Sequence, residues 1–210
     1  MLGAVDDAHV TPADPGLDAL RADTLRRLAL AGEYRDDNTH EHTERVGALA
    51  ARLAGALGLA DLDVGLIRRA APLHDLGKIA IPDSILLKPG RLEPEEYEVV
   101  KTHAVLGAHV LEDGGSPLLD TAAPIARSHH ERWDGAGYPD GLAGSAIPVA
   151  GRLVHVADVF DVLVHERPYR DSLSSEQAAQ EIRTGAGSQF DPDVVRAFDA
   201  LGAAAWTAAA

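Results

Sequence analysis

The sequence predicts an all-α protein, and three observations lead to this fold class. Alanine and leucine, both strong helix formers, dominate the 210 residues, whereas aromatic residues make up only 4%. Apolar residues in several segments recur every three or four positions, which places them on one side of a helix. The hydrophobic fraction of 46% is enough for a proper core. We therefore expect one helical domain, with or without a short appendage.

The charge and cysteine content exclude several functional classes. The formal net charge is −14, from 33 acidic and 19 basic residues, so binding to long nucleic acid or to an anionic membrane surface is not expected. The chain has no cysteine, which removes disulfides, thiolate chemistry and zinc fingers. The N-terminus lacks a basic, apolar leader, and no apolar run is long enough to span a membrane. We expect a cytoplasmic protein.

The first helix is expected over residues 17–32, after a polar tail. Its leucines are spaced by three, five and three residues and share one side: Leu17, Leu20, Leu25 and Leu28. This helix could dock on the domain or link it to an upstream module. A second helix follows, with a stripe formed by Val46, Leu49, Leu53 and Leu57. His42 lies one turn before this stripe and is either a core residue or a metal ligand.

A third helix is expected from Asp61 to Leu76, and it ends at the pair His74-Asp75. Such a pair offers a nitrogen and a carboxylate to one small volume, which suits Mn²⁺ or Fe²⁺. Lys78 follows one turn after His74 and places a cation where a phosphate oxygen would sit. The alternative for a bare His-Asp dipeptide is a solvated pair at a helix end.

After a loop, the next helix is expected from Pro94 to about Leu111, with acidic residues in its first turn. His103 and His109 on this helix are six residues apart and point in different directions, so at most one belongs to a given site. A further helix, from about Leu118, ends at His129-His130. Residues 132–148 are rich in glycine and are expected to form a loop.

The segment from Val149 to Leu163 is apolar nearly all round, as expected for a central buried helix, but it contains Asp158 and Asp161. Burying an unpaired carboxylate is costly, and a metal ion or a paired cation removes that cost. Two shorter helices follow. Ser174 or Ser175 is expected to cap the first, and Asp191-Pro192 to open the second. The Ala-rich end, residues 201–210, is expected to be a frayed tail.

Seven potential metal ligands occur at helix ends or on buried faces: His42, His74, Asp75, His103, His129, His130 and Asp158. Seven ligands suit two metals if Asp75 bridges them. One metal would then take His42, His74 and Asp158, and the other His103, His129 and His130. Two metals about 3.5–4 Å apart produce a hydroxide nucleophile and clamp an in-line displacement at phosphorus. Ligands without thiolates favour iron, with manganese as a substitute.

Five segments resemble the HD-GYP domain of the HD phosphohydrolase superfamily: HDLGK, IPDSILLKPGRLEPEEYEVVKTH, HHERWDGAGYP, ADVFDVL and RPYR. The resemblance covers roughly residues 35–200, and leaves residues 1–34 as a tail and linker helix. It implies a bacterial HD-domain helical bundle with extra C-terminal helices and a GYP loop. It also implies a metal-dependent phosphodiesterase that hydrolyses cyclic di-GMP to pGpG, and in some members to GMP, through a metal-bridging hydroxide.

The ligand pattern of the family falls on the seven residues above. Carried over in the same way, Asp75 and Lys78 are catalytic, and Lys78 steadies the scissile phosphate. The GYP motif falls on Gly137, Tyr138 and Pro139, and these residues are expected at the substrate. Tyr138 either stacks on a guanine or holds its loop in place. Arg167 and Arg170 are candidate phosphate contacts, with a structural salt bridge as the alternative for either.

Two positions depart from the family. Members with three metals carry a glutamate where this chain has Asn38, so two metals are expected here. A small-polar pair is common in the family at Val164-His165. Two alternatives to cyclic di-GMP hydrolysis stay open: a superfamily enzyme for another cyclic dinucleotide or nucleotide, and a non-catalytic cyclic di-GMP receptor. An upstream sensor or receiver module, or a second copy of the chain, would fit as a partner.

Overall fold

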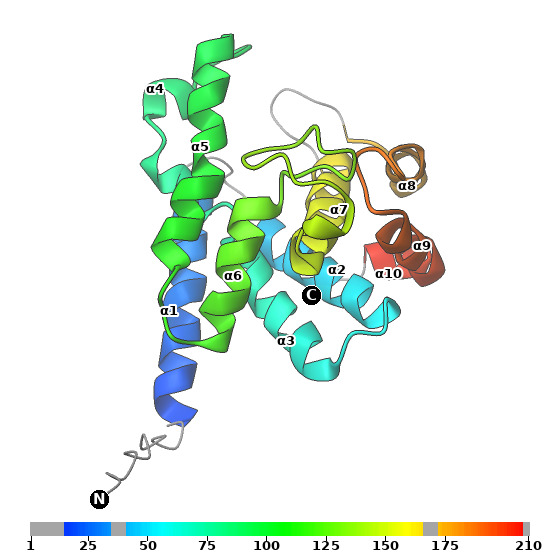
Figure 1. The fold of residues 1–210 in the computed structure, drawn as a ribbon, viewed down its shortest axis with the longest axis horizontal. Helices are drawn as coiled ribbons and strands as arrows, with labels where there is room; N and C mark the ends of the chain where they lie inside the picture. Colours follow the sequence, from blue (N-terminus) through cyan, green and yellow to red (C-terminus); the bar gives the residue numbers. More distant parts are fainter. Residues whose placement is uncertain (1–14, 35–40, 166–171, 208–210) are drawn as a thin grey trace, which may run out of the picture.

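A computed structural model describes residues 15–34, 41–165 and 172–207, with only the backbone described for residues 15–22. Within these ranges the chain forms helices, turns and two isolated bridges, without a strand (Figure 1). The predicted all-α fold class is therefore confirmed. Among the described residues, no helix combines the length and the apolar character that crossing a membrane requires.

The helices follow the predicted order closely. In chain order they are α1 (Pro15–Glu33), α2 (His42–Ala56), α3 (Asp61–Ala70), α4 (Asp83–Leu86), α5 (Pro94–Leu111), α6 (Pro117–Ser128), α7 (Val149–Val164), α8 (Ser175–Thr184), α9 (Pro192–Leu201) and α10 (Ala203–Trp206). Three short 3₁₀ turns, η1 (Ala71–Leu73), η2 (Leu76–Ala80) and η3 (Gly144–Ala146), lie between them. The predicted caps at Ser174 and Asp191 are present, since each side chain accepts a backbone N–H of its helix.

Helices α2 and α7 lie between two groups of helices (Figure 1). On one side α5 packs on α6, and α1 lies against the turns η1 and η2; on the other side are α8, α9 and α10. Phe160 of α7, Leu53 of α2 and Ile125 of α6 are fully buried in the shared core. The predicted central position of the apolar helix at residues 149–164 is thus confirmed.

The third helix is shorter than the sequence predicts. It ends at Ala70, and His74 and Asp75 lie between the turns η1 and η2. Pro72 explains the change, because proline has no N–H for the α-helical hydrogen bond and its ring obstructs the preceding turn. The expected loop before α5 also differs, because it contains η2 and the short helix α4.

Two glycines allow the close helix contacts on which the site depends. A Cβ on Gly77 of η2 would lie 1.9 Å from the carbonyl oxygen of His103, so only glycine lets η2 touch α5 there. A Cβ on Gly151 of α7 would lie 2.1 Å from Ser128 Oγ at the end of α6. The first contact lies beside His103 and the second beside His129, both of which are candidate ligands.

The expectation of a frayed C-terminal tail was wrong for residues 203–206. Trp206 of α10 is buried, and its ring stacks on Phe198 of α9 with centroids 4.6 Å apart and planes 1° from parallel. Its Nε1–H donates to the Phe198 carbonyl at 2.7 Å. A large aromatic side chain that buries its ring and satisfies its N–H outweighs the low complexity of the surrounding alanines.

Candidate metal centre

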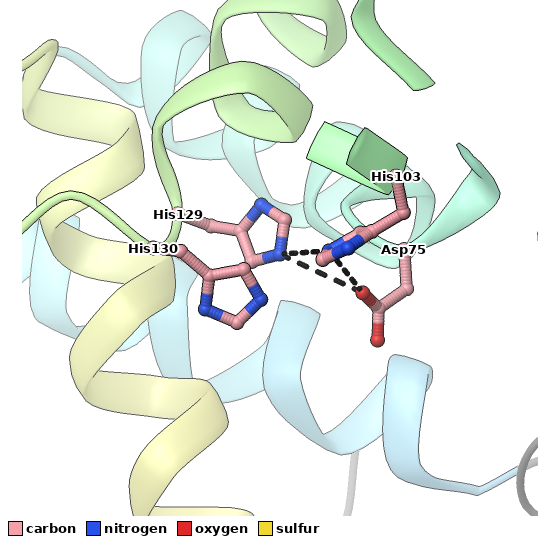
Figure 2. A group of neighbouring side chains, drawn as sticks. All are labelled: Asp75, His103, His129 and His130. Carbon is pink, nitrogen blue, oxygen red and sulfur yellow. Dashed lines mark hydrogen bonds and ion pairs between the residues drawn. The ribbon is translucent and has the colours of Figure 1, made fainter. Parts of the chain in front are cut away.

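The structure brings together all seven candidate ligands, in two groups. One group comprises Asp75, His103, His129 and His130 (Figure 2). The other comprises His42, His74 and Asp158. Within each group the potential ligand atoms lie within 4.8 Å of one another. The grouping is the one that the sequence predicted, and the ligand roles themselves remain a prediction.

Asp75 lies where the two groups meet. Its Oδ1 is 3.3 Å from Nε2 of His103 and 3.6 Å from Nε2 of His129. Its Oδ2 is 3.3 Å from Nε2 of His74, which belongs to the other group. Each oxygen of this carboxylate therefore faces a different set of imidazoles, which is the geometry that a bridging ligand needs.

The second group converges in a similar way on Asp158. Its Oδ1 lies 3.3 Å from Nε2 of His42 and 4.0 Å from Nε2 of His74. His42 comes from the start of α2 and Asp158 from the middle of α7, so the packing of these two helices sets the distance.

Backbone hydrogen bonds orient three of the imidazoles. The Nδ1 atoms of His74, His103 and His129 lie 2.9, 2.6 and 2.9 Å from the carbonyl oxygens of the residues three positions earlier: Ala71, Val100 and Ala126. A carbonyl only accepts, so Nδ1 carries the proton in each ring. Nε2 is then the ring nitrogen that faces the centre of the site and would bind a metal.

Two buried polar atoms support a bound cation. His74 Nε2 and Asp75 Oδ1 are buried and have no hydrogen-bond partner in the described part of the chain. Leaving such groups unsatisfied costs free energy, and native proteins seldom do so without a functional reason. Both atoms face the centre, and both are of the types that divalent transition metals bind. The residues present therefore fit a metal centre.

The charges of the site favour ionised carboxylates. Burial alone would raise the pKa of Asp158, but the hydrogen bond from His42 and the charge of His74 hold it well below its usual range. Asp75 is similar, since the charges of Lys78 and His74 outweigh its burial and lower its pKa. Both carboxylates are thus ready to bind a cation at neutral pH.

The histidines of the two groups differ in charge before metal binds. Burial lowers the pKa of His130 well below its usual range, and the charge of His129 lowers it further. The pKa of His42 shifts in the other direction. Burial alone would lower it, but hydrogen bonds to Asp158 and Asp161 raise it to about 10. A metal that binds His42 Nε2 must therefore displace a proton.

Lys78 extends from η2 to the edge of the site. Its Nζ lies 2.8 Å from Asp75 Oδ2, the oxygen that also faces His74. The predicted position of this cation beside the metal ligands therefore agrees with the structure, although the residue is on a 3₁₀ turn and not on a continuous helix.

The glycine-rich loop is fastened directly behind the His129-His130 pair. Glu131 is buried, and its carboxylate accepts the backbone N–H of Asp140 at 2.7 Å and of Leu142 at 3.1 Å. A Cβ on Gly137 would lie 2.3 Å from Arg132 N, so the GYP backbone passes directly over this segment. Sequence reasoning missed the role of Glu131. The sequence feature that could have predicted this role is a charged residue between a buried helix end and a glycine-rich loop.

Tyr138 contacts a candidate ligand. Its ring lies 4.7 Å from the ring of His130, centroid to centroid, with planes 30° apart. Tyr97 approaches edge-on at 6.4 Å, and Lys101 Nζ lies 5.6 Å from the Tyr138 ring centroid. Tyr97 and Lys101 were also missed, because nothing in the local pattern of α5 distinguishes them from solvated residues. The loop thus rests on both His130 and α5.

Replacing Tyr138 with alanine tests its two roles. If Tyr138 holds the loop and His130, hydrolysis of the substrate expected from the sequence, cyclic di-GMP, and of bis(p-nitrophenyl) phosphate should fall together, and the melting temperature should drop. We expect this result, because the ring packs on His130. A selective loss on cyclic di-GMP would show instead that Tyr138 contacts the base. A variant with wild-type activity and melting temperature would contradict both roles.

Other histidines and the remaining candidate residues are placed as follows. His109 is exposed and 3.7 Å from Glu112, in agreement with its exclusion from the site. His155 is buried on α7; its Nε2 lies 3.1 Å from Gln189 Nε2, and its ring contacts Phe190. Asn38, His40, Arg167 and Arg170 lie outside the described residues.

Comparison with known proteins identifies the family. The family model described as HD domain matches residues 33–194. The chain is 50% identical over 176 residues to a cyclic di-GMP phosphodiesterase of Thermotoga maritima, covering 84% of this chain and 48% of that protein. It is 48% identical over 179 residues to the cyclic di-GMP phosphodiesterase response regulator RpfG of Xanthomonas campestris, covering 85% of this chain and 47% of that protein.

A third relative has another substrate in its name. The 3'3'-cGAMP-specific phosphodiesterase 2 of Vibrio cholerae is 44% identical over 168 residues, covering 80% of this chain and 32% of that protein. The chain therefore spans about half the length, or less, of these relatives.

Solved structures agree on the fold. The cyclic GMP-AMP phosphodiesterase V-cGAP3 of V. cholerae superimposes with a TM-score of 0.67 at 23% identity, covering 86% of this chain and 48% of that one. Bd1817, an HDG"Y"P protein of Bdellovibrio bacteriovorus, superimposes with a TM-score of 0.64 at 20% identity. The superposition covers 91% of this chain and 65% of that one.

Proposed function

The chain belongs to the HD domain family, and from this premise we propose that it is a metal-dependent phosphodiesterase that hydrolyses cyclic di-GMP. One observation carries the proposal: two groups of potential ligands meet at the carboxylate of Asp75, with the ammonium of Lys78 beside it. Two relatives that are 50% and 48% identical to this chain over the aligned residues are named cyclic di-GMP phosphodiesterases. The predicted relationship to this family is confirmed by the match.

We propose that the seven residues hold two divalent transition-metal ions. Two such ions would lower the pKa of a bound water molecule, so that a hydroxide is available at neutral pH. They would also neutralise negative charge on the phosphate. Imidazole and carboxylate ligands without thiolate favour iron or manganese over a structural zinc, and we propose iron as the native metal, with manganese as its substitute. The two-metal stoichiometry rests on the two groups and on Asn38 at the position where three-metal members have a glutamate.

The other residues act on the substrate. We propose that the ammonium of Lys78, which lies 2.8 Å from Asp75 Oδ2, contacts the scissile phosphate, where its charge would stabilise the extra negative charge of the transition state. We propose that Gly137, Tyr138 and Pro139 also contact the substrate, because the Tyr138 ring packs on His130 and the Gly137 backbone passes close to the carbonyl oxygen of His130. Arg167 and Arg170 are proposed as further phosphate contacts on the strength of their RPYR motif alone.

The proposed product is pGpG, with GMP after a second hydrolysis, because cyclic di-GMP contains two phosphodiester bonds. A second candidate function is hydrolysis of another cyclic dinucleotide, which is supported by the relative specific for 3'3'-cGAMP. A non-catalytic receptor is the third candidate, and the presence of all seven ligands and of Lys78 weighs against it.

The proposal extends to the context of the enzyme. We propose residues 35–200 as the catalytic domain, close to the matched residues 33–194, and residues 1–34 as a connecting segment. A sensor or receiver module, or a second copy of the chain, is the proposed partner, in line with the relative that is named a response regulator. A cytoplasmic location is part of the same proposal.

A product assay tests the function. The full chain, loaded with Fe²⁺ or Mn²⁺ without oxygen, is incubated separately with cyclic di-GMP and with 3'3'-cGAMP, and the products are separated by chromatography. We expect pGpG from cyclic di-GMP at a higher kcat/KM than any product from 3'3'-cGAMP. The reverse preference would support the second candidate. Binding of cyclic di-GMP without turnover in the loaded protein would show a receptor.

A further inference from the structure

Asp161 is a buried carboxylate that the candidate ligand set leaves unused. It lies on α7, one turn after Asp158, and it is only 5% exposed. Its Oδ2 lies 2.7 Å from Nδ1 of His42, the ring nitrogen that faces away from Asp158. Asp161 and Asp158 therefore contact opposite nitrogens of the same imidazole.

Arg45 holds this carboxylate in place. Its Nε donates to Asp161 Oδ1 at 2.6 Å and its Nη2 donates to Oδ2 at 2.9 Å, so the contact is bidentate. Arg45 follows His42 by three residues on α2, so the two side chains meet Asp161 from one face of that helix. A third contact comes from His165, whose Nδ1 lies 3.2 Å from Asp161 Oδ1. His165 is one of the residues that depart from the family pattern.

His42 needs such a partner because of its place in the chain. The other three oriented imidazoles direct Nδ1 to a carbonyl three residues earlier: Ala71, Val100 and Ala126. His42 is the first residue of α2, so no turn of its own helix precedes it to supply that carbonyl. At His42 Nδ1, a carboxylate from a different helix occupies the position that a backbone carbonyl has in the other three rings.

We propose that Asp161, fixed by Arg45, is a positioning residue that sets the orientation of His42 and keeps the proton on Nδ1, so that Nε2 faces Asp158 and His74. The inference rests on the proposed metal site and deepens it. A carboxylate acceptor at Nδ1 also makes the imidazole a stronger ligand. Arg45 contacts both oxygens of Asp161, so a fixed positive charge holds the carboxylate that faces Nδ1.

The experiment measures metal affinity by competition with a chelator, on the full chain loaded with Mn²⁺, for the wild type and for Asp161→Asn and Asp161→Ala. We expect one of the two metals to bind about 10–100-fold more weakly in both variants, because partners of this kind contribute that much to affinity. After desalting, the metal content should fall from about two to about one per chain. The alanine variant should lose more than the asparagine variant, whose amide oxygen still accepts from Nδ1.

Two control variants separate positioning from folding. Asp191 is an equally buried carboxylate that pairs with Arg152 and caps α9, and it contacts none of the candidate ligands. Asp191→Asn should lower the melting temperature of the metal-free protein and leave metal affinity unchanged. His165→Ala removes only the more exposed contact, so the metal affinity should stay within about fivefold of wild type.

Three results would overturn the inference. Wild-type metal affinity in both Asp161 variants would show that His42 needs no orientation from this carboxylate. Equal metal loss in the Asp161 and Asp191 variants, in step with their melting temperatures, would reduce Asp161 to a structural role. A wild-type chain that binds no Mn²⁺ would overturn the proposed metal site, and the role of Asp161 with it. The first two results would overturn only the role of Asp161 and leave the proposed function intact.

Discussion

Replacing Asp75 with alanine is expected to abolish hydrolysis of cyclic di-GMP and to remove metal from both groups of ligands. The carboxylate places one oxygen toward His103 and His129 and the other toward His74, so its removal takes a potential ligand from both groups at once. Elemental analysis should find about two first-row transition metals per wild-type chain, as for other two-metal sites. The variant should retain close to none. Turnover in the product assay should fall below detection.

His109→Ala is the control for this prediction. His109 lies on the same helix as His103 but is exposed, so hydrolysis and metal content should stay near wild type. Equal losses in the two variants would contradict the ligand assignment. Three metals per wild-type chain would contradict the two-metal proposal. Melting temperatures are needed for both variants, because bound metal also stabilises the folded state.

Replacing Lys78 with alanine is expected to lower kcat for cyclic di-GMP by about 10²–10³, the effect of removing one preorganised charge from a transition state. Its Nζ is 2.8 Å from Asp75 Oδ2, at the edge of the site where a phosphate would bind. Both metals should remain bound, since the ammonium is not a ligand. Steady-state kinetics and elemental analysis of the same sample separate the two effects.

Lys88→Ala serves as the matched control. Lys88 is also a lysine in an ion pair, 2.6 Å from Glu96, but it lies beside the start of α5 and away from the ligands. Its removal should leave kcat unchanged. If Lys78→Ala loses metal as well as activity, Lys78 acts by holding Asp75, and the proposed contact with the phosphate is wrong.

Local pattern was sufficient for most helices. The spacing of Val46, Leu49 and Leu53 predicted α2, and the cap residues Ser174 and Asp191 predicted where α8 and α9 begin. These features depend on residues within one or two turns, so they can be read without knowing the fold. The ligand types were equally accessible, because histidines and aspartates at helix ends or on apolar faces need a partner wherever they are buried.

The sequence by itself therefore determined an all-helical HD domain and the seven residues of its candidate metal centre. The tertiary structure decided which side chains support them: Asp161 and Arg45 behind His42, Glu131 under the GYP loop, and Trp206 on Phe198. Asp161 and His42 are 119 positions apart, and no local pattern links them. Their contact exists because α2 and α7 pack side by side, and that packing depends on the volumes of the whole core.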